Sequence, residues 1–150
     1  ARGQGTTVLA NMTGAGSFVN TRANDFGGGV FAKDAIGVSD GAKVDLNVNG
    51  NDSFVRGDTA VSDKGTLVIH ATGERFALKR SYEDGMGDSS NLLKAESEGL
   101  AKISITGNDS KVEGQVKAET KGNIQLDMTG KNMNFKGDLR MRCIPGRNLL

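Results

Sequence analysis

The chain has 150 residues, which is enough for one domain with a buried core. Its net charge of +1 gives the chain as a whole no strong attraction to nucleic acid or anionic membranes, and no apolar run reaches the roughly 18 residues of a membrane-spanning helix. There are 22 glycines and a single proline, which favours many tight turns between extended segments over a disordered chain.

The first part of the chain, residues 8–43, is predicted to be a degenerate copy of a repeat. Shifted by 36 positions, residues 8–37 match residues 44–73 at nine of 30 positions. Residues 24–29 contain few apolar side chains and three consecutive glycines, and we interpret them as a loose loop or as a segment that becomes ordered on assembly.

The second copy, residues 44–79, alternates apolar and polar side chains with the period of a half-buried strand. Strands are predicted at 44–49, 54–61 and 66–71 and from residue 76, with turn residues between them. A polar insertion follows at 80–100. Its latter part, from Ser89 or Ser90 to Ala95, has the pattern of a short helix with a serine N-cap.

The third copy, residues 101–136, is the most regular. Shifting the chain by 57 positions aligns residues 46–79 with residues 103–136, and 11 of 34 positions are identical. The identical residues are mostly turn formers, whereas the core candidates exchange one apolar side chain for another, so the repeat preserves a shape. A last strand is predicted from Leu139 to Cys143, within a basic tail at 131–150.

Turns of two or three residues join these strands and are typical of hairpins, since a parallel crossover needs about a dozen connecting residues. The sequence therefore predicts a single all-β domain, an antiparallel β-meander sandwich or rolled barrel built from degenerate internal repeats. A β-solenoid is the alternative, because repeats punctuated by glycine also suit stacked coils. Residues 111–118, with 122–124, resemble the rung pattern of bactofilins, bacterial polymer-forming β-solenoids, over about a tenth of the chain.

No catalytic constellation is present in the sequence. The chain has one histidine, His70, on the polar face of its predicted strand, and one cysteine, Cys143, on an apolar face. An activated nucleophile or a zinc site needs more such groups than these. We therefore expect no enzymatic activity, no cofactor and no bound metal.

A non-enzymatic structural role fits these observations best. The chain is predicted to be a self-assembling subunit of an extracellular filament, pilus-like fibre, coat or matrix, whose copies join by β-strand addition. It begins with Ala1 and not with methionine, which favours a secreted or cell-surface protein that has lost its signal peptide. The alternatives are a glycan- or protein-binding β module that uses the polar sheet face or the 80–100 loop, and a structural component of a virus or phage.

Complementary charge is the candidate means of assembly, since the acidic insertion of one copy can meet the basic tail of the next. The candidate residues are Glu83, Asp84, Asp88, Glu96 and Glu98 in the insertion, and Lys131, Lys136, Arg140, Arg142 and Arg147 in the tail. Three Asn-x-Ser/Thr sequons, at Asn11, Asn51 and Asn108, are candidate glycosylation sites if the chain is exported.

Overall fold

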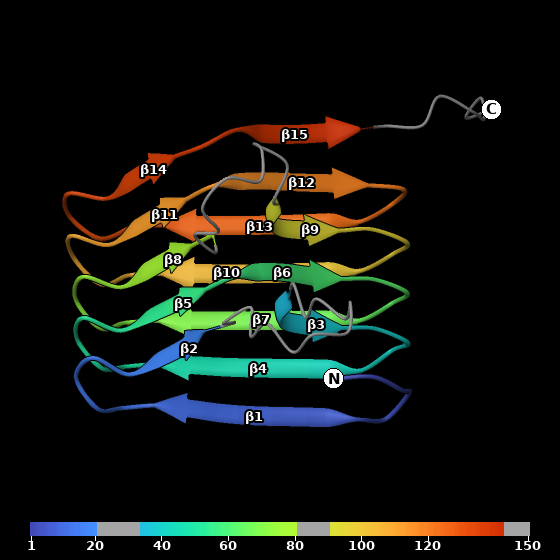
Figure 1. Ribbon diagram of the computed structural model, residues 1–150, viewed down its shortest axis with the longest axis horizontal. Coiled ribbons are helices and arrows are strands. Elements are labelled where there is room, and N and C mark those ends of the chain that lie inside the picture. The colour runs from blue at the N-terminus through green and yellow to red at the C-terminus, as the bar shows by residue number, and fades with distance from the viewer. Residues whose placement is uncertain (21–33, 81–90, 143–150) are drawn as a thin grey trace, which may run out of the picture.

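The computed structural model describes residues 1–20, 34–80 and 91–142, which form short strands stacked in a ladder along one axis (Figure 1). The strands are β1 Thr7–Met12, β2 Phe18–Asn20, β3 Asp34–Val38, β4 Lys43–Val48, β5 Phe54–Arg56, β6 Asp58–Val61, β7 Thr66–Ala71, β8 Ala77–Lys79, β9 Asn91–Ala95, β10 Leu100–Ile105, β11 Lys111–Glu113, β12 Gln115–Glu119, β13 Asn123–Met128, β14 Asn134–Lys136 and β15 Leu139–Arg142.

These strands belong to three parallel five-stranded sheets. Sheet 1 has the order β1-β4-β7-β10-β13, sheet 2 has the order β2-β5-β8-β11-β14, and sheet 3 has the order β3-β6-β9-β12-β15. Each circuit of the chain contributes one strand to each sheet, so three consecutive strands make one coil, and the coils are numbered 1 to 5 from β1. The described residues therefore form a β-solenoid whose sheets enclose one interior.

The predicted antiparallel sandwich or barrel is wrong, and the parallel arrangement agrees with the solenoid alternative. The short turns do not connect paired strands. They connect strands of different sheets, and each strand pairs with the strand three places further along the chain, so a whole coil serves as the crossover. That coil takes 23 residues from Lys43 to Thr66 and again from Leu100 to Asn123.

Two further predictions about local structure are corrected. The single strand expected at 54–61 is two strands, β5 and β6, which meet at a corner where Gly57 has a φ of 126°. The short helix expected up to Ala95 is wrong, because Asn91–Ala95 is strand β9 of sheet 3. Leu92 and Leu93 are both fully buried there, and this apolar pair had suggested a helical face.

Side chains that point inward form columns along the axis. Leu46, Ile69 and Ile103 are successive register partners in sheet 1, and none is more than 3% exposed. At the corner between sheets 1 and 2 small and large side chains alternate: Ser53 and Ser110 are fully buried in coils 2 and 4, while Phe76 fills the position in coil 3. This alternation gives the sequence a period of two coils, which is the 57-residue repeat.

The longer coils 1 and 3 carry their additional residues at the same corner, between sheets 2 and 3. The step from coil 1 to coil 2 is 36 residues and that from coil 3 to coil 4 is 34, with the surplus between β2 and β3 and between β8 and β9. The predicted loop at 24–29 lies outside the described residues.

Candidate assembly surfaces

The two ends of the solenoid are open edges. Strands β1 and β2 at one end, and β13, β14 and β15 at the other, each pair with a described strand on one side only. Strand β3 pairs with β6, and residues 1–3 bond to the end of its other side. An unpaired parallel strand presents a row of backbone N–H and C=O groups that can pair with another strand. We call the surface formed by β1–β3 the N-terminal end and that formed by β13–β15 the C-terminal end.

Both ends expose side chains of the interior columns. Phe135 and Leu139 of coil 5 follow the fully buried Val112 and Val116 in register, yet they are 40% and 62% exposed. At the other end, Val8 is 42% exposed. The apolar interior therefore reaches both ends of the described solenoid, where these side chains are exposed, and the two ends are candidate interaction surfaces.

The outer face of sheet 2 carries a second exposed feature, an aromatic pair beside cations. Phe18 is 63% exposed and stacks on Phe54, with ring centroids 5.3 Å apart and planes inclined by 9°. The Lys79 Nζ lies 4.6 Å from the centroid of Phe54, and the Arg56 guanidinium lies 5.2 Å from it. Partial burial lowers the pKa of Lys79, and the positive charges of Arg56 and Lys111 lower it further.

The acidic candidates that the structure describes are paired within the chain. Glu96 accepts from Lys94 at 2.7 Å, a hydrogen bond that raises the pKa of this lysine. Glu98 lies between two lysines of neighbouring coils, 4.0 Å from Lys64 and 3.6 Å from Lys121. The remaining acidic candidates, Glu83, Asp84 and Asp88, lie outside the described residues.

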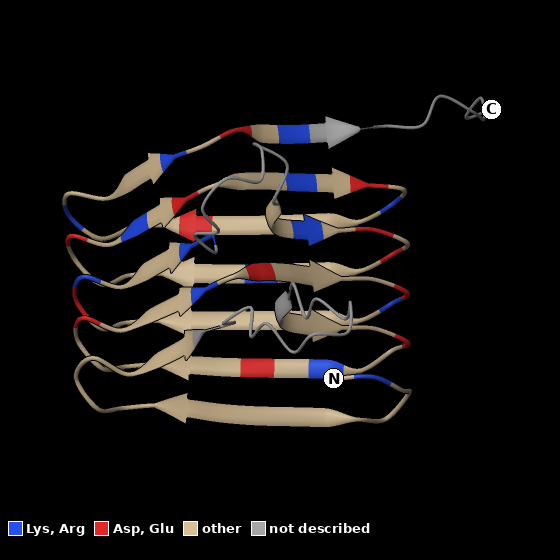
Figure 2. Ribbon diagram, in the orientation of Figure 1, with Lys and Arg blue, Asp and Glu red and all other residues tan. Residues whose placement is uncertain are grey.

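The basic candidates gather on coil 5, where Figure 2 shows blue segments in the turn before β14, at the end of β14 and on β15. Lys131 and Lys136 are exposed, and Arg140 is paired with Asp138 at 3.4 Å. Arg142 ends β15, and Arg147 lies outside the described residues. At the opposite end, β1 and β2 contain no charged residue, so these two strands offer coil 5 no acidic counterpart.

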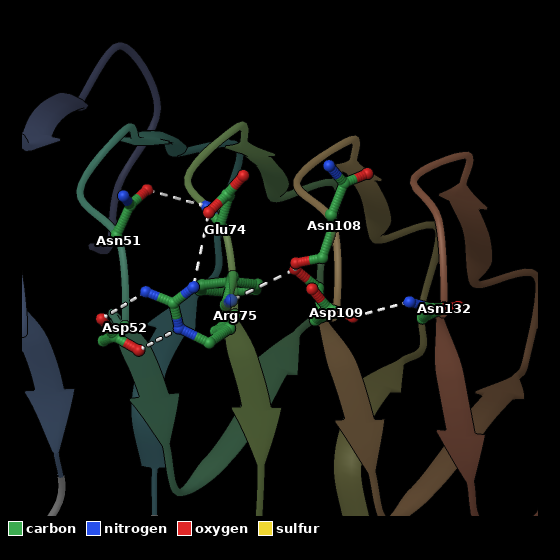
Figure 3. A network of polar contacts seen from close by, with 9 residues as sticks. Asn51, Asp52, Glu74, Arg75, Asn108, Asp109 and Asn132 are labelled. Carbon is green, nitrogen blue, oxygen red and sulfur yellow. Dashed lines mark hydrogen bonds and ion pairs between the residues drawn. The ribbon is translucent and has the colours of Figure 1, made fainter.

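A polar network along the corner between sheets 1 and 2 ties neighbouring coils together (Figure 3). Arg75 of coil 3 binds Asp52 of coil 2 through two hydrogen bonds of 2.6 and 2.9 Å, which raises the pKa of Arg75 and lowers that of Asp52. The same positions in coils 4 and 5 hold Asp109 and Asn132, joined at 2.9 Å. The network therefore repeats every second coil.

All three sequon asparagines lie in the described part of the chain, two of them at this corner. Asn51 and Asn108, predicted to be equivalent, do occupy the same turn position, and each side-chain oxygen accepts the backbone N–H of the next coil at 3.0 Å. Asn11 accepts from Asn47 on the outer face of sheet 1. Glycosylation at the three sites remains a prediction. Ser53 and Ser110, which complete the Asn51 and Asn108 sequons, are fully buried.

The glycines at this corner stack along the axis in a column, which we call the glycine column. The sequence analysis did not identify this column. Gly14, Gly50, Gly73, Gly107 and Gly130 open the five equivalent turns. A Cβ built on any of the last four would meet the carbonyl oxygen of the preceding glycine far inside van der Waals distance. The 23-residue spacing from Gly50 to Gly73 and from Gly107 to Gly130 is the signal that could have revealed single coils.

His70 is exposed on the outer face of sheet 1, as predicted, whereas Cys143 lies outside the described residues. Among the residues that the structure describes, no three His, Cys, Asp or Glu side chains are grouped to hold a metal ion. The same residues contain no helix long and apolar enough to cross a membrane. Comparison with protein-family models, curated proteins and solved structures found no match to this chain.

Proposed function

We propose that this chain is a structural subunit whose copies assemble end to end into a longer β-solenoid fibre of an extracellular or cell-surface structure. The observation that carries the proposal is the uncovered interior at both ends, with Phe135 and Leu139 at one end and Val8 at the other. Edge strands β1 and β2 and strands β13 and β14 supply the backbone groups for β-strand addition.

Apolar burial and strand pairing are the two terms that favour association. Full burial of a Val, Leu or Phe side chain contributes roughly 1.5–3 kcal/mol, and the three exposed interior side chains would lose their remaining exposure in the contact. New strand pairing adds about 1 kcal/mol per hydrogen bond. These gains oppose the roughly 4–15 kcal/mol that association costs in lost motion.

The contact we propose depends on apolar burial and strand pairing more than on charge. Glu96 and Glu98 follow β9 in coil 3, two coils away from the C-terminal end, and are paired with lysines of the same chain. Strands β1 and β2 are uncharged. Assembly is therefore expected to persist when the salt concentration is raised. Loss of assembly at high salt would indicate that charge pairing, and not apolar burial, stabilises the contact.

The experiment is sedimentation velocity with negative-stain microscopy on the purified chain and on Leu139→Lys. This substitution places a charge on the C-terminal end at a side chain that is already 62% exposed, so folding should be retained. The matched control is His70→Lys, which adds a charge to the outer face of coil 3. We expect fibres from the wild type and the control, and monomers from Leu139→Lys. A wild-type chain that stays monomeric at all concentrations would refute the proposal.

A second candidate function is supported by the aromatic pair on the outer face of sheet 2. Phe18 and Phe54, with Lys79 and Arg56 beside them, form a surface suited to an acidic glycan, whose sugar rings stack on aromatic faces and whose anions pair with cations. Binding to an array of acidic glycans, lost in Phe18→Ala and weakened by salt, is the expected result. An array without hits would remove this candidate.

A further inference from the structure

The glycine column at the corner between sheets 1 and 2 has a direction. In coils 2 to 5, the missing Cβ of each glycine faces the carbonyl oxygen of the equivalent glycine in the preceding coil: Gly50 faces Gly14, and Gly73 faces Gly50. Each of these glycines therefore has a steric reason to lack a side chain. The carbonyl of one coil always fits against the bare Cα of the next.

Gly14 of coil 1 has no such reason among the described residues. It opens the same turn, since Gly16 has a φ of 71° where Asp52, two residues after Gly50, has 59°. However, a Cβ on Gly14 would meet within 4 Å only the Ser17 Oγ, at 3.3 Å. Gly14 thus leaves a bare Cα at the N-terminal end, while the Gly130 carbonyl at the C-terminal end has no described glycine against it.

The backbone hydrogen-bonding groups at this corner also match between the two ends of the solenoid. The N–H of Gly50 donates to the Met12 carbonyl at 3.0 Å, and the N–H of Gly16 donates to the Asn51 carbonyl at 2.8 Å. The equivalent groups at the two ends are the Gly14 N–H and Ala15 C=O of coil 1, and the Met128 C=O and Asn132 N–H of coil 5. Each donor at one end has its acceptor at the other.

We infer that a second copy of this chain docks head to tail, with its coil 1 continuing the register of coil 5, so that Gly14 packs on the Gly130 carbonyl. This inference rests on the proposed end-to-end assembly and adds its polarity and register. Strand β1 would pair with β13, placing Val8 on Ile124, and β2 would pair with β14, placing Val19 on Phe135. Residues 1–3 of the second copy already pair with the end of its β3, in the place that a continued register would give to Arg140–Arg142 of the first copy. The end of β15 must therefore move aside, and the contact lies on sheets 1 and 2 and the beginning of sheet 3.

A head-to-tail contact joins two different surfaces and leaves one free at each end, so it grows without limit. Blocking either surface stops growth, and mixing two differently blocked chains restores a single contact. Gly14→Ala blocks the N-terminal end and Leu139→Lys blocks the C-terminal end. Ala15→Ser, one residue away in the same exposed turn, is the control.

We expect the wild type and Ala15→Ser to form long assemblies in sedimentation velocity. Gly14→Ala should weaken association at least tenfold while the monomer keeps its thermal unfolding midpoint, because within one copy the new Cβ meets only Ser17. Leu139→Lys should also remain monomeric. An equimolar mixture of the two variants should give a one-to-one dimer.

Site-specific crosslinking tests the register without relying on the glycine variant. In a Cys143→Ser background, Ala15→Cys in one copy and Lys131→Cys in another would bring two thiols together at neighbouring turn positions, about 4.8 Å apart between Cα atoms and within disulfide reach. Ala15→Cys mixed with His70→Cys is the control. We expect a disulfide-linked dimer from the first pair only.

The outcomes separate the two levels of the proposal. If the wild type does not associate, end-to-end assembly fails and the inferred register fails with it. If the wild type associates but Gly14→Ala associates equally well and the Ala15–Lys131 crosslink does not form, only the head-to-tail register is overturned. A defined dimer of Leu139→Lys alone, without its partner variant, would indicate a symmetric contact between two N-terminal ends and would also overturn it.

Discussion

Replacing Gly107 with alanine tests the glycine column where it is held from both sides. The added Cβ would fall on the Gly73 carbonyl oxygen, a rigid backbone atom, far inside van der Waals distance. Coil 4 cannot move away freely, because Ile103 and Ile105 pack in the core just before this turn and Ser110 is buried just after it. Overpacking of this kind costs typically 1–3 kcal/mol, and we expect about 3 because no side chain can yield.

The assay is urea unfolding followed by far-UV circular dichroism, with the free energy of unfolding as the result. The matched control is Gly130→Ala, whose Cβ would lie 2.7 Å from the Gly107 carbonyl oxygen in the last described coil, which can shift more easily. We expect a loss of about 1 kcal/mol there. A free energy of unfolding for Gly107→Ala within about 0.5 kcal/mol of the wild type would refute the steric reasoning.

Three further predictions concern the core and the corner network. Phe76→Ala should lower the free energy of unfolding by roughly 3–5 kcal/mol, because the Phe76 side chain is fully buried. Phe135→Ala, at a side chain that is 40% exposed, should cost under about 1 kcal/mol, and an equally small loss for Phe76→Ala would contradict the described core. Thr59→Val should leave urea stability unchanged or raise it by about 1 kcal/mol, since the buried Thr59 Oγ1 has no hydrogen-bond partner among the described residues; a clear loss would reveal a partner. Folding lowers the pKa of Asp52 through its bonds to Arg75, so the unfolded chain binds more protons in acid. This contribution is complete above a pH of about 4 and disappears as the pH falls through the lower folded value, and thermal unfolding midpoints of Arg75→Gln should lack that part of the acid dependence.

The sequence carries the local structure of this fold more clearly than its topology. Alternation at Val44, Leu46 and Val48 predicted strand β4 with its inward face, and the glycine and asparagine clusters marked the turns. Strand direction could not be obtained in the same way, because short turns and a period-two pattern are common to hairpins and to solenoid corners. The 36- and 57-residue offsets both correspond to the structure, but each spans a coil that contains additional residues. Because of those residues, and because core side chains alternate between coils, the 23-residue unit was not recognised in the sequence.

The candidate assembly surfaces were predictable only in part. The shape-preserving repeat suggested strand addition without indicating the two ends as candidate contacts, because exposure of Phe135 and Leu139 follows from their place in the last coil and not from their neighbours in sequence. Charge runs pointed to Glu98 as an assembly residue, yet two lysines of adjacent coils already lie beside it. A charge run in the sequence does not show which partners the coils bring alongside.

The most direct test of end-to-end assembly is the helical geometry of the assembled wild-type chain, measured by electron cryomicroscopy. Five coils with a strand spacing of about 4.8 Å predict an axial rise of roughly 24 Å per copy and unbroken strand spacing across the junction between copies. A rise that does not fit five stacked coils, or copies joined side by side with their ends uncovered, would contradict the account.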